Sequence, residues 1–398
     1  MLPRIMLALI LLAVDLYAFQ GIRTALGASA AFPVVQALYW GFTALVLAGI
    51  AVSLVIDRHR WPKALMLYFP PVFLSAFIAK FILIVFLLVD DLIRAALLVS
   101  GQAAPERIAG LSWAGLIIGG IPFLLLLYGM IRNAYRYEYR SIPLAFPDLH
   151  PDLRGLRIVQ LSDIHAGSLH RPDLVTQAVE RINALSPDLI FFTGDLVNMV
   201  ASEAEPYLPV FRQLRARLGV FSITGNHDYG DYVSWEHPQQ KVANFEALKT
   251  MHSRLGWRLL MNEHELLRIG KATLAVIGIE NWSAFGRFPK YGDLASAHRG
   301  TGQADMRLLL SHDPSHWKAQ VLPDYPDIHA MFAGHTHGFQ FGLEIGNWRW
   351  SPGQYFYREW AGLYEQAKRF LYVNRGFGYT FYPGRVGMRP EITVFELV

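Results

Sequence analysis

The chain of 398 residues contains no cysteine. This absence excludes disulfides, thiolate metal sites and a cysteine nucleophile, although it does not fix the cellular compartment. Charged residues are also scarce: they make up 17% of the chain, against about a quarter in a usual soluble domain, and 53% is hydrophobic. Part of the chain is therefore expected to lie in lipid. The net charge of +4 comes without a dense block of Lys and Arg, so no nucleic-acid partner is expected.

Four apolar runs in the first third of the chain approach the roughly 20 residues that a helix needs to cross the hydrocarbon core. They are Ile5–Gly27, Val34–Ile56, Pro71–Leu92 and Leu111–Ile131. Pro70 and Pro71 are expected to set the start of the third helix, because proline breaks a helix interior. A cleaved signal peptide is the alternative for the first run. The length of that run and the charge of Asp15 within it favour a retained helix.

Basic residues near the helix ends predict how these spans are oriented. With the N-terminus inside, seven basic residues lie on the inner side and three on the outer side. The inner ones are Arg4, Arg58, Arg60, Lys63, Arg132, Arg136 and Arg140, and the outer ones are Arg23, Arg94 and Arg107. We therefore expect both termini in the cytoplasm. If the third run held two spans instead of one, the C-terminal half would lie outside.

Two charged residues are predicted to meet between membrane helices. Asp15 lies in the first helix and Lys80 in the third, and at 1.5 Å rise per residue both reach a depth of about 14–15 Å. A lone charge near the middle of a bilayer costs at least about 2.5–3.5 kcal/mol, so such residues usually pair. The alternative is that Lys80 snorkels to the surface or that Asp15 is protonated and alone.

The chain divides into a membrane part, residues 1–140, and an α/β part, residues 141–398. The first is expected to end in an interfacial helix with Arg132, Arg136 and Arg140 on one face. In the second, apolar strands end in the motifs "SDIH", "GDLVN", "GNHD", "SHDP" and "GHTH". Polar residues that follow such strands gather at one edge of an α/β sheet.

These strand ends supply carboxylate, imidazole and amide groups, but no thiolate. The residues are Asp163, His165, Asp195, Asn226, His227, His312, His335 and His337. This mixture suits two divalent ions such as Mn, Fe or Zn. Two such ions about 3.5–4 Å apart activate a water as hydroxide and stabilise its in-line attack on phosphorus.

The five motifs, in this order, resemble those of the calcineurin-like metallophosphoesterases over about residues 142–398. The tail "LYVNRGFG…PGRVGMRPEITVFEL" is similar to the membrane-associated bacterial branch of that family, which includes UDP-2,3-diacylglucosamine hydrolases of lipid A synthesis. The resemblance implies a sandwich of two mixed sheets flanked by helices, following an α-helical transmembrane bundle. It also implies a multi-pass protein of the bacterial inner membrane, with Mn²⁺ as the expected metal and Fe or Zn as alternatives.

The resemblance further implies a role for each matching residue. Asp195 would bridge the two metals. The other ligands would be Asp163, His165 and His337 for the first metal, and Asn226, His312 and His335 for the second. His227 would protonate the leaving oxygen or stabilise the charge on it, and Asp228 would orient the His227 imidazole.

Several other stretches are candidates for substrate contact. Arg375 and Arg385 either bind a phosphate or serve as structural arginines. The aromatic segment 347–364 is either core packing or a wall for an acyl chain, and the loop Asn281–Gly292 is a candidate cap. We expect a membrane-anchored hydrolase of a lipid-linked phosphodiester or pyrophosphate, such as UDP-2,3-diacylglucosamine. The alternatives are a phosphodiesterase for soluble nucleotides and a non-catalytic receptor for phosphate ligands.

Overall fold

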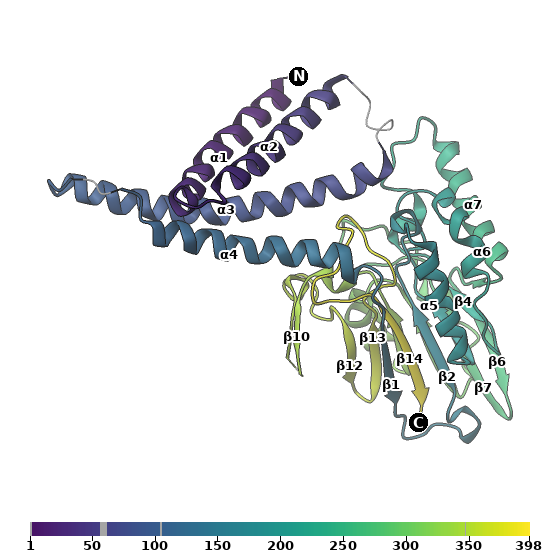
Figure 1. Cartoon of the computed structure of the whole chain (residues 1–398). Helices are drawn as coiled ribbons and strands as arrows, with labels where there is room; N and C mark the ends of the chain where they lie inside the picture. The colour runs from purple at the N-terminus through teal and green to yellow at the C-terminus, as the bar shows by residue number, and fades with distance from the viewer. Residues whose placement is uncertain (1, 56–61, 104–105, 347) are drawn as a thin grey trace. The chain divides into compact units, whose positions relative to one another are not determined.

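The computed structural model describes residues 2–55, 62–103, 106–346 and 348–398. It divides into two compact units, Met1–Gly129 and Met130–Val398 (Figure 1). The division falls before the predicted boundary at residue 141, because the residues just before that point already belong to a strand of the second unit. Arg58 and Arg60, which contribute to the predicted orientation, lie outside the described residues.

The first unit contains four long helices in its described residues. They are α1 (Leu2–Leu26), α2 (Phe32–Val55), α3 (Lys63–Val99) and α4 (Ala109–Tyr128). Each is long and apolar enough to cross a membrane, which confirms the four predicted spans. Glycine allows α4 to approach α3 closely, since a Cβ on Gly119 would lie 2.6 Å from the Ala79 carbonyl oxygen.

Helix α3 begins earlier than the sequence suggested. It starts at Lys63 and continues through Pro70 and Pro71, so the prediction that these prolines set its start was wrong. Proline is tolerated inside membrane helices where neighbouring groups satisfy the carbonyls it leaves without a donor, and this compensation is invisible in the local sequence. The third run forms one continuous helix, not two.

The segment after α4 also differs from its prediction. A π-helical turn, Gly129–Asn133, ends the helix, and strand β1 (Glu138–Leu144) follows. The predicted helix with three arginines on one face was therefore wrong. Of the three arginines, Arg140 lies in β1, which pairs in parallel with β14 (Glu391–Leu397), a partner about 250 residues away that local periodicity cannot reveal. Arg140 lies 2.7 Å from carboxylate oxygens of Glu138 and Glu344.

The second unit contains two six-stranded mixed sheets, as predicted. Their strand orders are β1-β14-β2-β3-β4-β5 and β12-β13-β9-β8-β7-β6. The remaining strands of the first sheet are β2 (Arg157–Leu161), β3 (Leu189–Phe192), β4 (Val220–Ser222) and β5 (Arg258–Leu259). Those of the second are β6 (Glu263–Ile269), β7 (Ala272–Gly278), β8 (Met306–Leu310), β9 (Ala330–Ala333), β12 (Gly362–Gln366) and β13 (Arg369–Val373). A separate hairpin joins β10 (Leu343–Ile345) to β11 (Trp348–Trp350).

Apolar side chains from both sheets form the core between them. Phe191 of β3 and Phe332 of β9 meet there with ring centroids 5.2 Å apart. Helices cover the outer faces and bury further apolar side chains. They are α5 (Pro172–Ala184), α6 (Leu208–Phe211) and α7 (Pro238–Leu255) on the first sheet, and α8 (Leu294–His298) and α9 (Leu322–Asp324) on the second. The polar groups that follow these strands lie together at one edge of the sandwich.

Candidate metal centre

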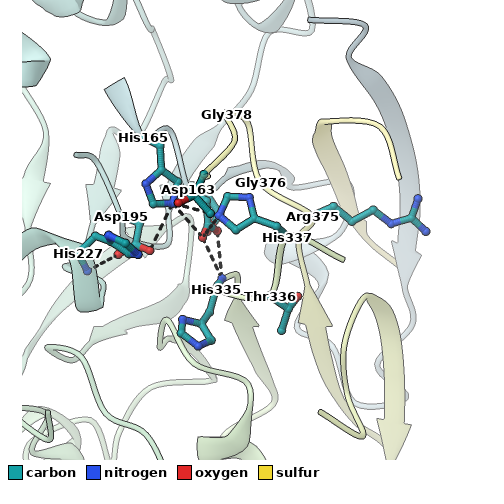
Figure 2. A network of polar contacts seen from close by, with 12 residues as sticks. Asp163, His165, Asp195, His227, His335, Thr336, His337, Arg375, Gly376 and Gly378 are labelled. Atoms are coloured by element: carbon teal, nitrogen blue, oxygen red, sulfur yellow. Dashed lines mark hydrogen bonds and ion pairs between the residues drawn. The ribbon is translucent and has the colours of Figure 1, made fainter. Parts of the chain in front are cut away.

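The predicted ligands and His227 come from the ends of five strands, three in one sheet and two in the other. Asp163 and His165 follow β2, Asp195 follows β3, Asn226 and His227 follow β4, His312 follows β8, and His335 and His337 follow β9. Figure 2 shows carboxylates and imidazoles of this group pointing toward one another. The two halves of the site thus belong to different sheets, and sandwich packing brings them together.

The first cluster contains Asp163, His165 and His337. The His337 Nε2 atom lies 3.2 Å from Asp163 Oδ1 and 3.0 Å from His165 Nε2. The Asp163 and His165 side chains are fully buried. Three potential ligand atoms therefore face one point, as a bound cation requires.

The second cluster contains Asp195, His312 and His335. Asp195 Oδ2 lies 3.2 Å from His312 Nε2, and His312 Nε2 lies 3.3 Å from His335 Nδ1. The same Asp195 oxygen lies 3.6 Å from His165 Nε2 of the first cluster. One carboxylate oxygen therefore faces both clusters, which is the geometry expected of a bridging ligand.

Asn226 provides an independent test of whether these residues fit a metal pair. Its Nδ2 donates to the Tyr232 hydroxyl at 2.7 Å, which fixes the amide. Its Oδ1 is buried and has no hydrogen-bond partner among the described residues. A buried polar atom without a partner is costly, and a cation would satisfy it. The amide oxygen therefore fits the predicted role of a ligand to the second ion.

The backbone at the site is held in an unusual conformation. Five of the seven predicted ligands have positive φ, namely Asp163, His165, Asp195, His335 and His337. Non-glycine residues adopt this region only where the surroundings enforce it, and such strain gathers at functional sites. Gly334 is required for close approach, because a Cβ there would collide with the side chains of Ser162 and Asp163.

The electrostatics of the site favour positive charge between the strands. Burial acts to raise the pKa of the Asp163 carboxyl, but His337 holds it well below its usual value. Burial acts in the same way on Asp195, and His312 with its neighbours outweighs it. Burial opposes protonation of His312, yet the Asp195 carboxylate raises its pKa to about 10. The two carboxylates are therefore ionised although buried, which suits a divalent cation.

Comparison with known sequences identifies the family. Residues 156–339 match the calcineurin-like phosphoesterase family, and residues 2–134 match a probable calcineurin-like phosphoesterase transmembrane domain. The uncharacterized metallophosphoesterase YkuE of Bacillus subtilis is 31% identical over 61% of this chain and 79% of its own length. The chain belongs to the calcineurin-like phosphoesterase family.

Two further relatives carry descriptive names. A transmembrane protein with metallophosphoesterase domain from Danio rerio is 31% identical over 75% of this chain, which spans 66% of that relative. The UDP-2,3-diacylglucosamine pyrophosphatase LpxG of Chlamydia trachomatis is 31% identical over 60% of this chain and 81% of its own length. The chain accordingly combines a transmembrane domain with a metallophosphoesterase domain, and the clustered potential ligands of the second suit divalent metals.

Within this phosphoesterase site, His227 and Asp228 are arranged differently from the prediction. The Asp228 carboxylate accepts hydrogen bonds from four backbone amides, those of Asp195, Leu196, Val197 and Gly225. The His227 imidazole is held by another group, because its Nδ1 lies 2.8 Å from the Asn198 carbonyl oxygen. Asp228 therefore fixes the loop that carries Asp195, and the prediction that it orients His227 was wrong.

Arg375 and Arg385 were candidates for binding phosphate, and the structure assigns both guanidiniums to internal contacts. Arg375 is fully buried and forms two hydrogen bonds to Glu344, at 2.9 and 3.0 Å. Figure 2 shows its side chain directed away from the histidines. Arg385 is also fully buried and donates to carbonyl oxygens, including that of His337 at 3.0 Å. These are the structural arginines of the alternative interpretation.

Three residues beside the ligands were not singled out from the sequence. The Tyr357 hydroxyl lies 2.7 Å from His335 Nε2 and donates to Asp313 Oδ2 at 3.3 Å. This contact leaves His335 Nδ1 to face the second cluster. Tyr232 packs on His227 with ring centroids 4.5 Å apart. The motif "SHDP" contains Asp313, but nothing in the local sequence links it to Tyr357.

In the first unit, the structure brings Asp15 and Lys80 into contact. The Lys80 Nζ atom lies 2.6 Å from Asp15 Oδ1, and both side chains are largely buried. Thr43 of α2 donates to the other carboxylate oxygen, and the Tyr39 hydroxyl donates to the Asp15 carbonyl oxygen at 2.8 Å. Asp15 thus connects three helices through polar contacts.

Proposed function

We propose that this phosphoesterase hydrolyses a phosphodiester or pyrophosphate bond in a lipid-linked substrate, with Mn²⁺, at the cytoplasmic face of a bacterial inner membrane. The observation that carries the proposal is the position of Asp195 Oδ2, 3.2 Å from His312 Nε2 and 3.6 Å from His165 Nε2. When bound, two divalent ions would activate water and neutralise charge on the phosphate. The chain's own residues hold and orient the reacting groups.

His227 is the residue proposed to transfer the proton. Its backbone amide donates to Asp195 Oδ1 at 2.9 Å, which places it beside the bridging carboxylate. Its Nδ1 donates to the Asn198 carbonyl oxygen, so Nε2 is the nitrogen left to protonate the leaving oxygen. His227 also lies close enough to His165 and Asp195 to serve as a metal ligand, and metal analysis of a variant separates the two roles.

Exposed aromatic side chains near the ligands support an amphipathic substrate. Phe339 follows His337 by two residues and stacks on Phe356, with ring centroids 5.5 Å apart. Phe356 is 58% exposed and Tyr355 is 74% exposed. The aromatic segment 347–364 therefore contains two kinds of residue. Tyr357 is buried beside the ligands, whereas Tyr355 and Phe356 face solvent. Asn347 of that segment lies outside the described residues. Exposed apolar patches of this kind mark ligand, partner or membrane contacts.

A further exposed aromatic side chain lies in the loop that carries Arg385. Asn133 is buried and donates to the Arg385 carbonyl oxygen at 3.1 Å. The neighbouring Phe381 is 87% exposed. Exposed aromatic residues are favoured where a protein meets amphipathic molecules, so Phe381 is a further candidate for contact with such a substrate.

The relatives suggest which lipid to test first. The Chlamydia protein named LpxG is a UDP-2,3-diacylglucosamine pyrophosphatase, and this chain covers 81% of it. Hydrolysis of that substrate adds water across the P–O–P bond and yields UMP and a diacylglucosamine phosphate. We propose this molecule as the named candidate for the present chain.

The test uses full-length protein purified in detergent with Mn²⁺, given UDP-2,3-diacylglucosamine, UDP-N-acetylglucosamine and bis(4-nitrophenyl) phosphate in parallel. We expect release of UMP from the lipid substrate to be fastest. Asp195→Asn is the inactive control. If only the two soluble substrates are cleaved, the chain is a phosphodiesterase for soluble substrates and the lipid assignment fails. If none is cleaved with Mn, Fe or Zn, the two-metal mechanism fails as well.

A further inference from the structure

The loop Asn281–Gly292 connects β7 to α8 and is held firmly at its base. The Asn281 side chain is buried and donates to the Pro289 carbonyl oxygen at 2.9 Å. The backbone amides of Tyr291 and Gly292 donate to the Asn281 carbonyl oxygen at 2.9 and 3.1 Å. The ring of Trp282 stacks on His316 with centroids 4.4 Å apart. These contacts fix the direction in which the tip of the loop projects.

The tip of this loop packs on the second ligand cluster. The ring of Phe288 lies edge-on to the His335 imidazole, with centroids 4.8 Å apart. The ring of Phe285 packs on Tyr357 with centroids 5.0 Å apart, and the Tyr357 hydroxyl contacts His335 Nε2. The candidate cap therefore lies directly beside the ligands of one ion.

Arg287 is the cation that this tip carries to the site. Its guanidinium carbon lies 4.8 Å from the centre of the Phe288 ring and 5.9 Å from that of Phe285. Burial raises the pKa of the Tyr357 phenol, whereas a hydrogen bond from Arg287 acts to lower it. Arg287 also acts electrostatically on Tyr232, on the other side of the site. Its side chain is exposed, so the guanidinium can be reached by a ligand from solvent.

We propose that Arg287 forms a second anion subsite, which binds the phosphate next to the reacting phosphorus and thereby makes the enzyme selective for a pyrophosphate linkage. This inference rests on the proposed two-metal function. The ions would bind the reacting phosphate, but a neighbouring phosphate brings its own negative charge and needs its own cation. A guanidinium offers several donors in one plane and matches phosphate oxygens in two-point contact. The rings of Phe285 and Phe288 position this guanidinium, and a simple phosphodiester has no group to occupy the subsite.

Two probes that differ by one phosphate test this subsite. They are bis(4-nitrophenyl) phosphate and P1,P2-bis(4-nitrophenyl) pyrophosphate, given to full-length protein in detergent with Mn²⁺. We expect Arg287→Ala to lower kcat/KM for the pyrophosphate probe by about 10- to 100-fold, the usual worth of a hydrogen bond to a charged group. For the simple diester the change should stay below about threefold. Arg287→Lys should lie between, because it keeps the charge and loses the planar geometry.

Lys290→Ala is the matched control, since Lys290 is a cation of the same loop that lies over Trp282, 4.7 Å from the ring centre. It should leave both rates unchanged, and metal content should be the same in all variants. Equal losses on both probes, or no loss on either, would overturn the subsite. A wild-type protein that cleaves the diester but not the pyrophosphate would overturn it too. A wild-type protein that cleaves neither would instead overturn the proposed function on which it rests.

Discussion

Asp195 lies beside both ligand clusters. Its Oδ2 faces His165 and His312, while its Oδ1 accepts the backbone amide of His227. We predict that Asp195→Asn loses both ions and nearly all activity, because an uncharged amide cannot offset two divalent charges. Elemental analysis of purified protein measures the metal content. An exposed control, Asp173→Asn, should keep two ions; a bridging variant that also kept two would refute the role.

His227 should affect turnover without affecting metal binding. We predict that His227→Gln retains both ions and loses about 10²–10⁴ in kcat, the usual contribution of a general acid. The loss should be smaller for a 4-nitrophenolate leaving group than for an alkoxide, because a stable anion needs no proton. Metal analysis and rates on the two substrates check this together. Loss of one ion from the variant would make His227 a ligand.

At the residue scale, the sequence reveals which groups are present but not which groups they contact. Asp163 and His335 are visible because they follow apolar strands, and strand ends gather in α/β sheets. The function of Asp228 is not visible, since its four amide partners come from two loops. Arg375 looks equally suited to bind phosphate until Glu344, 31 residues away in the sequence, is seen to take its guanidinium.

At the scale of elements, the polar contact between α1 and α3 has a measurable energetic consequence. We predict that Asp15→Asn and Lys80→Met each lower the unfolding temperature in detergent more than the double variant does. Each single change leaves one partner buried without its contact, whereas the double change removes both. The coupling should be about 0.5–3 kcal/mol.

The control for this pair is Arg23→Gln, an exposed change on the same helix α1, which should have little effect. Thermal unfolding followed by tryptophan fluorescence gives the four values of the cycle. Strictly additive losses from the two single variants would show that the ion pair contributes no coupling of its own.

The length and the apolar character of the membrane helices were the features that the sequence predicted best. All four membrane helices appear where long apolar runs occur, because a helix must span a core about 30 Å thick. Their ends were less predictable. Helix α3 continues through two prolines that usually end a helix. Strand β1 depends on β14, a partner far away in the chain that periodicity does not report.

For the whole molecule, the proposed lipid-linked substrate would have to reach the ligands from the membrane. Four spans return the chain to the side on which it began. The excess of inner basic residues then predicts that the catalytic unit lies in the cytoplasm. The exposed aromatic residues near the ligands are consistent with a substrate that has an apolar part.

The absence of cysteine makes this topology directly testable. We predict that a single cysteine at Ala28→Cys, in the exposed turn between α1 and α2, reacts with a membrane-impermeant maleimide in cells with a permeabilised outer membrane. A single cysteine at Ala247→Cys, exposed on α7 of the catalytic unit, should react only after the inner membrane is opened. The unmodified chain is the negative control for labelling, because it has no thiol that the maleimide could modify. Labelling of the α7 position in cells with an intact inner membrane would place the catalytic unit outside. The phosphoesterase would then have to act on a lipid that has already crossed the membrane.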